Sequence, residues 1–408
     1  MLLEPEAVPL EPEAVPLVRS AGSEGSLGIL HVMESTIGGT RRHLRDVAAA
    51  QAAAGHRVHV VAAALRMPEV REDFDRLRAV GVEVREVPMV RAIQPRTDVR
   101  HLTQLRRILR EVRPDVVHTH SSKAGVLGRL ASKSTGVGAR VHTPHTFAFL
   151  FDAMFSDAKR RLFRTIETQL GRQTDRLVAV SESERVTISE SGVIAASRVR
   201  VVPNGVDTSD FLGAVPVDRG DLGVPADAPL LATVGLLNVA KGQDLALEAL
   251  ALSEAQEAHL LIVGHGEERE ALGRLAEQLG VEARVHFLGW RDDVPGLLAA
   301  SDGLLLPSRW EGMPYIVLEA MAAGLPIVAS RVDGARELVT EGVNGALAEV
   351  GDPADLARAI GRWLACGSGQ RAAWGRASRD RVEADYTLEH MRLRLDEVYR
   401  EAIAERGQ

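Results

Sequence analysis

Short apolar runs alternate with amphipathic stretches of helical length along most of this chain. Such an alternation is typical of a parallel sheet with helices on both faces, because parallel strands need a crossover connection and are buried on both sides. The first set of predicted strands is at residues 28–33, 58–63, 82–87, 115–120, 139–143, 177–181 and 199–203. The second set is at residues 230–235, 259–264, 285–289, 303–307 and 327–330. We therefore expect an α/β fold with two doubly wound sheets.

The chain has 408 residues, which is more than one hydrophobic core usually supports, so two lobes are expected. Turn-forming residues follow the first set of strands, beginning with Pro203, Asn204 and Gly205. We place the hinge there, which gives an N-terminal lobe at 27–206 and a C-terminal lobe at 207–385. Residues 386–408 should form a last helix with one apolar face, since residues 388, 391, 395, 398 and 402 are apolar.

The first 26 residues contain the heptad LEPEAVP twice and are rich in proline and glutamate. This composition predicts a disordered or extended tail, to which we assign no function. Residues 1–17 carry no Lys or Arg, so no secretory signal is expected, and no apolar run approaches the ~20 residues of a membrane span. The single cysteine, Cys366, fits a reducing compartment. We expect a cytoplasmic protein.

Charge is distributed unevenly between the two predicted lobes. Residues 27–206 hold 29 basic and 18 acidic side chains, whereas residues 207–408 hold 19 and 33. Basic helical stretches are predicted at 100–113 and at 159–172, the second with an apolar stripe at Leu162, Phe163, Ile166 and Leu170. Such a helix could lie on the anionic inner membrane face, and the alternative is a solvated face over a core. No nucleic-acid partner is expected.

Two glutamates, Glu311 and Glu319, lie in the otherwise apolar segment 307–330. A carboxylate in apolar surroundings costs several kcal/mol unless it is partnered, either by a nearby arginine or by a hydroxylated ligand. Pro314 suits the first turn of the helix that follows, so the backbone N–H groups near Gly312 and Met313 should face a ligand at its positive end. Such an end attracts phosphate.

The Glu-x7-Glu spacing followed by LEAMAAGLPIVAS resembles the retaining glycosyltransferases of family 4. The resemblance extends from about Ile29 to the last helix. It implies the GT-B fold, in which two Rossmann-like lobes enclose a nucleotide-sugar site and the last helix crosses back to the first lobe. It also implies that Glu311 contacts hydroxyls of the transferred sugar and that Glu319 contacts the ribose.

Lys241 follows the glycine that ends a predicted strand, Gly235, and opens a helix with Gly242. A lysine there can neutralise a diphosphate, although a lone lysine of this kind is more often a surface residue. The family has an arginine directly after the strand glycine, where this chain has Leu236, so Arg291 or a cation of the basic lobe would have to replace it.

Further donor-side positions follow two other strands. Gly264 ends a strand and would approach the nucleotide, although a lone G-x-G is weak evidence. Trp290 and Arg291 lie where the family wraps the base, and the alternative for Trp290 is a cap on the core.

The acceptor side is expected on the N-terminal lobe. Its GGxxxH pattern, Gly38, Gly39 and His43, would let a ligand approach the backbone, and His145 matches the family's active-site histidine. A polar wall is predicted at His118, His120, Ser121 and Lys123. Metal binding is the less favoured use of these histidines, because no carboxylate lies beside them to complete a ligand set.

We expect a retaining, metal-independent transferase that moves a sugar from a nucleotide diphosphate sugar, a UDP-sugar in the main hypothesis, to a hydroxyl acceptor. The acceptor would be anionic, lipid-linked or a polysaccharide precursor, and the nucleotide sugar is a substrate, so no cofactor is implied. One alternative is a non-catalytic sugar-nucleotide-binding protein, suggested by Leu236. Another is a metal-dependent GT-A transferase, for which Asp73 and Asp75 give a D-x-D match on a charged, surface-exposed helix. A phosphorylase or epimerase on the same two lobes is a weaker alternative.

Overall fold

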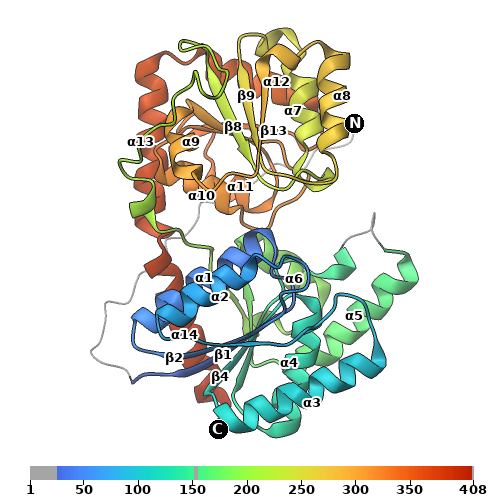
Figure 1. The fold of residues 1–408 in the computed structure, drawn as a ribbon. Helices are drawn as coiled ribbons and strands as arrows, with labels where there is room; N and C mark the ends of the chain where they lie inside the picture. Colours follow the sequence, from blue (N-terminus) through green and yellow to red (C-terminus); the bar gives the residue numbers. More distant parts are fainter. Residues whose placement is uncertain (1–24, 151–154, 407–408) are drawn as a thin grey trace, which may run out of the picture.

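The computed structural model describes residues 25–150 and 155–406, and most of the predicted tail lies outside these residues. Two parallel sheets form the cores of two lobes that are stacked one above the other (Figure 1). The first sheet has the order β3-β2-β1-β4-β5-β6-β7 and the second has the order β10-β9-β8-β11-β12-β13. Both are doubly wound, so the predicted fold class is confirmed.

The elements of the first lobe lie close to their predicted positions. Its strands are β1 (Gly28–Met33), β2 (Arg57–Ala62), β3 (Glu83–Glu86), β4 (Val116–His120), β5 (Ala139–Thr143), β6 (Arg176–Ala179) and β7 (Val199–Val201). Its helices are α1 (Gly38–Ala53), α2 (Val70–Ala79), α3 (Pro95–Val112), α4 (Ser122–Thr135), α5 (Asp157–Gly171) and α6 (Glu182–Ser191). Short 3-10 helices are η1 (Ala148–Leu150), η2 (Ala196–Arg198) and η3 (Thr208–Asp210).

The second lobe repeats this arrangement. Its strands are β8 (Leu230–Val234), β9 (His259–Val263), β10 (Val285–Gly289), β11 (Gly303–Leu306), β12 (Ile327–Ser330) and β13 (Gly345–Ala348). Its helices are α7 (Gln243–Leu250), α8 (Arg269–Leu279), α9 (Val294–Ala300), α10 (Tyr315–Ala322), α11 (Asp333–Leu338), α12 (Pro353–Ala365) and α13 (Ser368–Asp385), and α14 (Leu388–Arg406) ends the chain. Its 3-10 helices are η4 (Val239–Lys241), η5 (Ser253–Ala255) and η6 (Glu282–Arg284). The sequence prediction missed β13, whose residues GALA include no β-branched or aromatic side chain.

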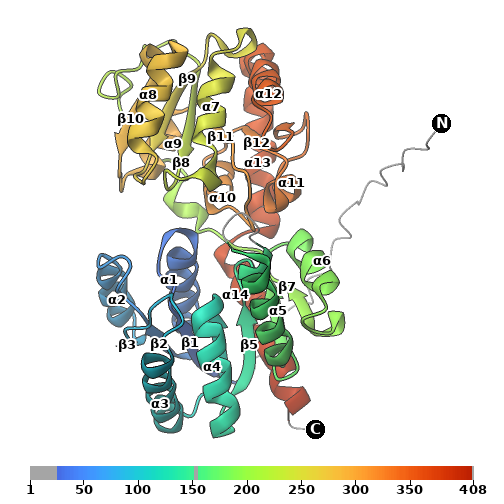
Figure 2. The same cartoon turned by 90° about the vertical axis from the view of Figure 1, so that its right-hand side faces the viewer.

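Alternate residues of each strand pack on opposite faces of the first sheet, as the pleat requires. Leu30 and Val32 of β1 pack with α3 and α4. Ile29 of the same strand packs with Val47 of α1 and with the buried face of α14. Figure 2 shows α14 extending from the C-terminal lobe along the N-terminal lobe. No helix in the described part of the chain has the length and apolar character to cross a membrane.

The two places where the chain crosses between the lobes are hydrogen-bonded to each other. Val206 forms an isolated bridge with Thr387, and its amide donates to the carbonyl of Tyr386 at 2.9 Å. A side chain at Gly205 would collide with the Thr387 carbonyl, so only glycine allows this approach. The predicted lobe limits at residues 206 and 385 lie at these crossings, but the limits themselves stay predictions.

The burial of α5 fits the alternative of a solvated face over a core, and the expectation that both aspartates of α2 are exposed is wrong for one of them. The stripe of α5 packs mostly inward, since Leu170 is buried and Phe163 packs on a core cluster, which leaves only Leu162 half exposed. In α2, Asp75 is exposed as expected, but Asp73 is buried and pairs with Arg41 of α1 at 2.5 Å. Both aspartates lie within a helix rather than at a strand end, so they do not form the metal motif of a GT-A enzyme.

Candidate active site

Glu311 and Lys241 meet at the carboxyl edge of the second sheet, where β8 and β11 are neighbours. Lys241 Nζ donates to Glu311 Oε1 at 2.6 Å, and Ser308 Oγ donates to the same oxygen at 2.8 Å. Lys241 ends η4, and Gly242 follows with a φ of +65°, so the lysine precedes α7 rather than opening it. A Cβ at Gly235 would lie 3.7 Å from Lys241 Cε, so the missing side chain leaves room beside the lysine. The structure therefore brings three predicted donor-side residues together.

The Gly-Met-Pro turn before α10 packs against the N-terminal lobe. A Cβ at Gly312 would lie 3.3 Å from Val180 Cγ2, and Asn204 Nδ2 donates to the Met313 carbonyl at 2.9 Å. Met313 is buried in the core, and Pro314 occupies the N-cap of α10 rather than its first turn. The turn is thus a contact between the lobes as well as the predicted donor-facing loop.

Glu319 is paired across the lobes. It is buried in α10 and forms an ion pair with Arg42 Nη1 of α1. The Arg42 guanidinium also lies over the Tyr315 ring, 5.3 Å from its centroid. An arginine partner is one of the two alternatives that the sequence leaves for Glu319, and in the structure this arginine comes from the opposite lobe. A ribose that binds Glu319 would have to displace it.

The predicted base-side residues lie at the outer part of the second sheet. A Cβ at Gly264 would collide with the Gly235 carbonyl. The residues that follow β8 and β9 can therefore approach this closely only because residue 264 is glycine. Trp290 is 55% exposed, with its ring edge-on to His265 at 5.3 Å, so it does not cap the core. Arg291 pairs with Asp293 at 2.5 Å on the surface.

Residue 236 is a leucine, so it provides no positive charge. Leu236 is half-buried, and its Cδ1 would lie 3.9 Å from a Cβ at Gly38 of the opposite lobe. Arg291, proposed from the sequence as a substitute, is held by Asp293. The guanidinium of Arg42, which contacts Tyr315 and Glu319, is a positive charge that the N-terminal lobe places against the C-terminal lobe.

On the acceptor side, α1 begins at Gly38. Gly38 has a φ of +50°, and a Cβ at Gly39 would lie 3.5 Å from the Tyr315 ring. Nδ1 of His43 lies 3.1 Å from Asn204 Oδ1 and 3.2 Å from Tyr315 Oη. The GGxxxH segment thus contacts the donor lobe directly.

His145 lies in an unusual backbone segment after β5. His145 and Thr146 have φ values of +50° and +82°, a region that non-glycine residues rarely occupy. The buried carboxylate of Glu184 holds this segment by accepting from the amides of Thr146 at 3.0 Å and Val180 at 2.7 Å. The His145 ring packs edge-on to His43 at 4.7 Å.

His118 and His120 share one face of β4, as their alternation predicted, with ring centroids 4.1 Å apart. Both are fully buried, so they do not form a solvent-facing wall. His118 is bonded in the interior to Tyr399 of α14 at 2.7 Å and to Thr143 at 2.8 Å. The sequence could not show that α14 covers this face.

A chain of hydrogen bonds connects the interior with His145. Gln51 Nε2 donates to Tyr399 Oη at 3.2 Å, which leaves Gln51 Oε1 to accept from His31 Nε2 at 2.8 Å. A neutral imidazole has one donor and one acceptor. His120 Nε2 therefore donates to His31 Nδ1 at 3.0 Å, and His145 Nε2 donates to His120 Nδ1 at 3.3 Å. This order leaves Nδ1 of His145 as an acceptor, without a hydrogen-bond partner among the described residues.

Burial keeps these imidazoles neutral. Desolvation lowers the pKa of His31 and of His43 to about 4, and it holds the pKa values of His120 and His145 well below their usual range. Neutral imidazoles are metal ligands, and in two groups of three the ligand atoms lie within 4.8 Å of one another. These groups are His31, His118 and His120, and His43, His120 and His145. A third histidine thus supplies, in each group, a ligand that the sequence alone does not place beside His118 and His120.

The last two acceptor-side residues follow β4. Ser121 has a φ of +59°, and its Oγ is buried with no partner in the described part of the chain. Lys123 Nζ is held by Asp98, at 2.7 and 2.8 Å from its two carboxylate oxygens. Lys123 is therefore neutralised rather than free to meet a ligand.

Sequence reasoning missed several residues of this region. Arg42 and Tyr315 occupy variable positions inside the GGxxxH and Glu-x7-Glu motifs, so the motifs do not single them out, and His31 and Glu184 lie outside both motifs. For His31 a signal existed, because a histidine within a predicted buried strand needs a partner.

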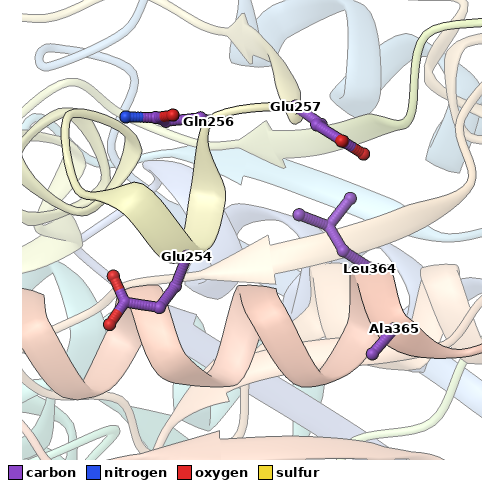
Figure 3. Close-up of a pocket in the computed structure, with 5 residues that line it drawn as sticks. All are labelled: Glu254, Gln256, Glu257, Leu364 and Ala365. Carbon is purple, nitrogen blue, oxygen red and sulfur yellow. The ribbon is translucent and has the colours of Figure 1, made fainter.

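A surface hollow of about 330 Å³ lies elsewhere, lined by Glu254, Gln256, Glu257, Leu364 and Ala365 (Figure 3). Residues 254–257 precede the first residue of β9, so the hollow is at the amino edge of the sheet. Ligands of open α/β sheets bind beyond the carboxyl edge. The hollow contains none of the predicted site residues.

Comparison with known proteins adds to this geometry. The family model described as "Glycosyl transferases group 1" matches residues 215–381, and "Glycosyltransferase Family 4" matches residues 37–210. An Escherichia coli protein named UDP-Gal:alpha-D-GlcNAc-diphosphoundecaprenol alpha-1,3-galactosyltransferase is 33% identical over 265 residues, which cover 62% of this chain and 67% of that protein. The putative glycosyltransferase EpsD of Bacillus subtilis is 30% identical over 315 residues, covering 75% and 79%.

Among solved structures, Anabaena HepE in complex with UDP-glucose superposes with a TM-score of 0.76. The two chains are 25% identical, and the match covers 91% of this chain and 98% of HepE.

Proposed function

The chain belongs to glycosyltransferase family 4, and on this premise we propose that it transfers a sugar from a UDP-sugar to a hydroxyl acceptor with retention of configuration. The proposed acceptor is lipid-linked or a polysaccharide precursor, and no metal ion is required. The nucleotide sugar is a substrate, not a cofactor.

The observation that carries the proposal is the contact between Lys241 and Glu311 at the carboxyl edge of the second sheet. An ammonium group 2.6 Å from the carboxylate is close enough to stabilise a leaving diphosphate while Glu311 binds the transferred sugar. Ser308 and Lys241 hold Glu311 Oε1, which suits a binding group better than a nucleophile. A retaining hydrolase forms a covalent intermediate on a carboxylate. We therefore favour front-face attack assisted by the leaving phosphate.

His145 would orient the reaction from the other lobe. Its Nδ1 is left as an acceptor by the hydrogen-bond chain through His120, so it can accept from a hydroxyl of the sugar or of the acceptor. Closure of the lobes would exclude water and bring His145 to the donor.

Two comparisons support the choice of substrates. HepE binds UDP-glucose, and the Escherichia coli relative is named for a UDP-galactose donor and a diphosphoundecaprenol-linked acceptor. A lipid-linked acceptor also fits the basic N-terminal lobe.

The proposed membrane contact depends on α5. Lys159, Arg161 and Arg164 are exposed there beside Leu162, and Arg164 Nη2 also donates to the Ser191 carbonyl at 2.6 Å. Arg160 is less exposed and is held by the Phe149 carbonyl and Asp157. Anionic vesicles should bind the protein at low salt, and binding should fall with salt and in a variant with Lys159, Arg161 and Arg164 changed to Gln. Arg274→Gln with Arg358→Gln, on exposed helices of the other lobe, is the control. Vesicle binding that is changed neither by salt nor by the substitutions in α5 would refute the proposed membrane contact.

A panel of nucleotide sugars tests the function. A selective UDP-sugar should raise the melting temperature by mass action, and it should then yield a glycosylated product that retains the anomeric configuration. EDTA should leave the rate unchanged. Binding without any product across a broad acceptor panel would favour the non-catalytic alternative, and loss of activity in EDTA would refute metal independence.

A further inference from the structure

Glu34 and Ser121 follow neighbouring strands, and each has a buried side-chain oxygen without a hydrogen-bond partner among the described residues. Glu34 is 3% exposed, and neither a hydrogen bond nor an ion pair joins its carboxylate to another described residue. Ser121 Oγ is likewise buried and unpaired in that part of the chain. Strands β1 and β4 end at Met33 and His120, which are paired, so Glu34 and Ser121 are the first residues after two neighbouring strand ends.

This position is the switch point of the first sheet. After β1 the chain forms β2 and β3 on one side of this strand, and it then returns to form β4 and β5 on the other side. Crevices beyond the carboxyl ends of such strands are where open α/β sheets bind ligands. Ser121 also has a left-handed φ of +59°, a strained conformation that is common at functional sites.

An unpaired buried carboxylate destabilises a folded protein, so its presence calls for an explanation. Burial raises the pKa of Glu34, and the nearby positive charges of Arg66, Arg91 and Lys123 oppose that rise. Lys123 is already held by Asp98, whereas Arg66 has one contact, from Nη1 to Ser35 Oγ at 3.2 Å. The region thus combines unpaired oxygen atoms with exposed guanidinium groups.

We propose that Glu34 and Ser121 bind hydroxyls of a sugar ring in the acceptor and that Arg66 and Arg91 bind a phosphate attached to that ring. Two carboxylate oxygens can accept from neighbouring ring hydroxyls, and the serine hydroxyl can donate or accept. Arginine is suited to phosphate because its planar fork binds two oxygens. The acceptor would thus be a phosphorylated sugar, an inference that rests on the proposed transfer to a hydroxyl acceptor.

Thermal unfolding of the full chain tests this without any need for turnover. The probes are glucose 1-phosphate, galactose 1-phosphate and N-acetylglucosamine 1-phosphate, compared with the free sugars and with inorganic phosphate. At about ten times the dissociation constant, at least one sugar phosphate should raise the melting temperature by about 3 °C. Glu34→Gln and Ser121→Ala should lose most of this shift, and the exposed Glu72→Gln should keep it.

A second measurement uses the free protein. Because Glu34→Leu removes an unpaired buried carboxylate, it should raise the melting temperature without ligand, whereas a structural carboxylate would lower it. A lower melting temperature would overturn the inference. So would shifts that are the same with inorganic phosphate alone, or unchanged in Glu34→Gln. Stabilisation by UDP should persist in every variant, and its absence from the unmodified protein would instead refute the proposed function.

Discussion

Arg42 of α1 and Glu319 of α10 form an ion pair that joins the two lobes. Glu319 is buried, so its charge needs a partner in the protein without ligand. If the ribose hydroxyls bind Glu319, they take the place of this guanidinium. The carboxylate of Glu319 would then hold the two lobes together before the nucleotide binds, and it would bind the ribose afterwards.

Glu319→Gln should weaken UDP binding by about tenfold to a hundredfold, because hydrogen bonds to a charged acceptor contribute about 1.5–3 kcal/mol. Arg42→Ala should leave the affinity for UDP unchanged or increase it, since it removes a competitor. Isothermal titration calorimetry of both single variants and the double variant measures the effect. Equal losses in the two single variants would show that Glu319 acts only through the lobe contact.

Lys241→Ala should lower kcat by about 10²–10³, the loss that follows removal of one group that stabilises developing charge. The reason is that Lys241 is the ammonium group held at Glu311, and Leu236 offers no charge beside it. Steady-state kinetics with the UDP-sugar identified by thermal shift gives the value.

The exposed lysine Lys133 provides the matched control, and Lys133→Ala should leave kcat within about twofold. A Lys241→Ala enzyme with an unchanged kcat would remove Lys241 from the mechanism. A change confined to KM would indicate that the lysine only binds the donor.

The sequence predicted the fold because strands and helices depend on local patterns. Twelve of the thirteen strands were located, and β13 was missed because its residues have weak strand propensity. The positions of Lys241 and Glu311 could be foreseen in the same way, because each follows a buried strand and such strand ends meet at one edge of a sheet.

The rest depends on tertiary contacts that no local pattern encodes. Arg42 meets Glu319, and Tyr399 meets His118, over sequence separations of hundreds of residues. The alternation of His118 and His120 shows that both side chains share one face of the sheet, which predicts a polar surface there. It does not show which element covers that face. In the structure α14 covers it.

Acid should destabilise the protein through its buried histidines. His31 and His43 have pKa values lowered to about 4 by burial, against 6.5 when unfolded. A lowered pKa contributes stability that is present above pH 6.5 and is lost as the pH falls toward 4. Each of these histidines should lower the free energy of unfolding at pH 5 by about 2 kcal/mol relative to its value at pH 7.5.

Urea unfolding between pH 7.5 and 5 measures this loss. His31→Gln should have a shallower pH dependence, and His390→Gln, at a partly exposed position, should follow the unmodified protein. A pH dependence that is the same in His31→Gln would show that His31 is not neutral in the folded state.

Glu184 should give the opposite pH dependence. Burial raises its pKa from 4.5 to about 6, although the amides of Val180 and Thr146 favour the charged form. A raised pKa contributes stability that is fully present below pH 4.5 and is lost as the pH rises through 6, a loss of about 2 kcal/mol for this group. The difference in unfolding free energy between the unmodified protein and Glu184→Gln should therefore fall by about that amount between pH 4 and 7.5. Glu190→Gln, at an exposed position on the same helix, should show no such change.

Glu184→Gln should also lower activity at pH 7.5, because Glu184 supports the backbone beside His145. The backbone N–H groups of Thr146 and Val180 donate to different oxygens of the carboxylate. A glutamine has an NH2 group in place of one of these oxygens, so one of the two backbone N–H groups would face a donor and lose its hydrogen bond. The segment with left-handed φ values at His145 and Thr146 would lose one of its restraints. We expect kcat to fall by about tenfold while the affinity for UDP, which the opposite lobe provides, stays unchanged. Kinetics and calorimetry on the same sample separate the two effects, and a loss of UDP affinity with an unchanged kcat would contradict the role given to Glu184.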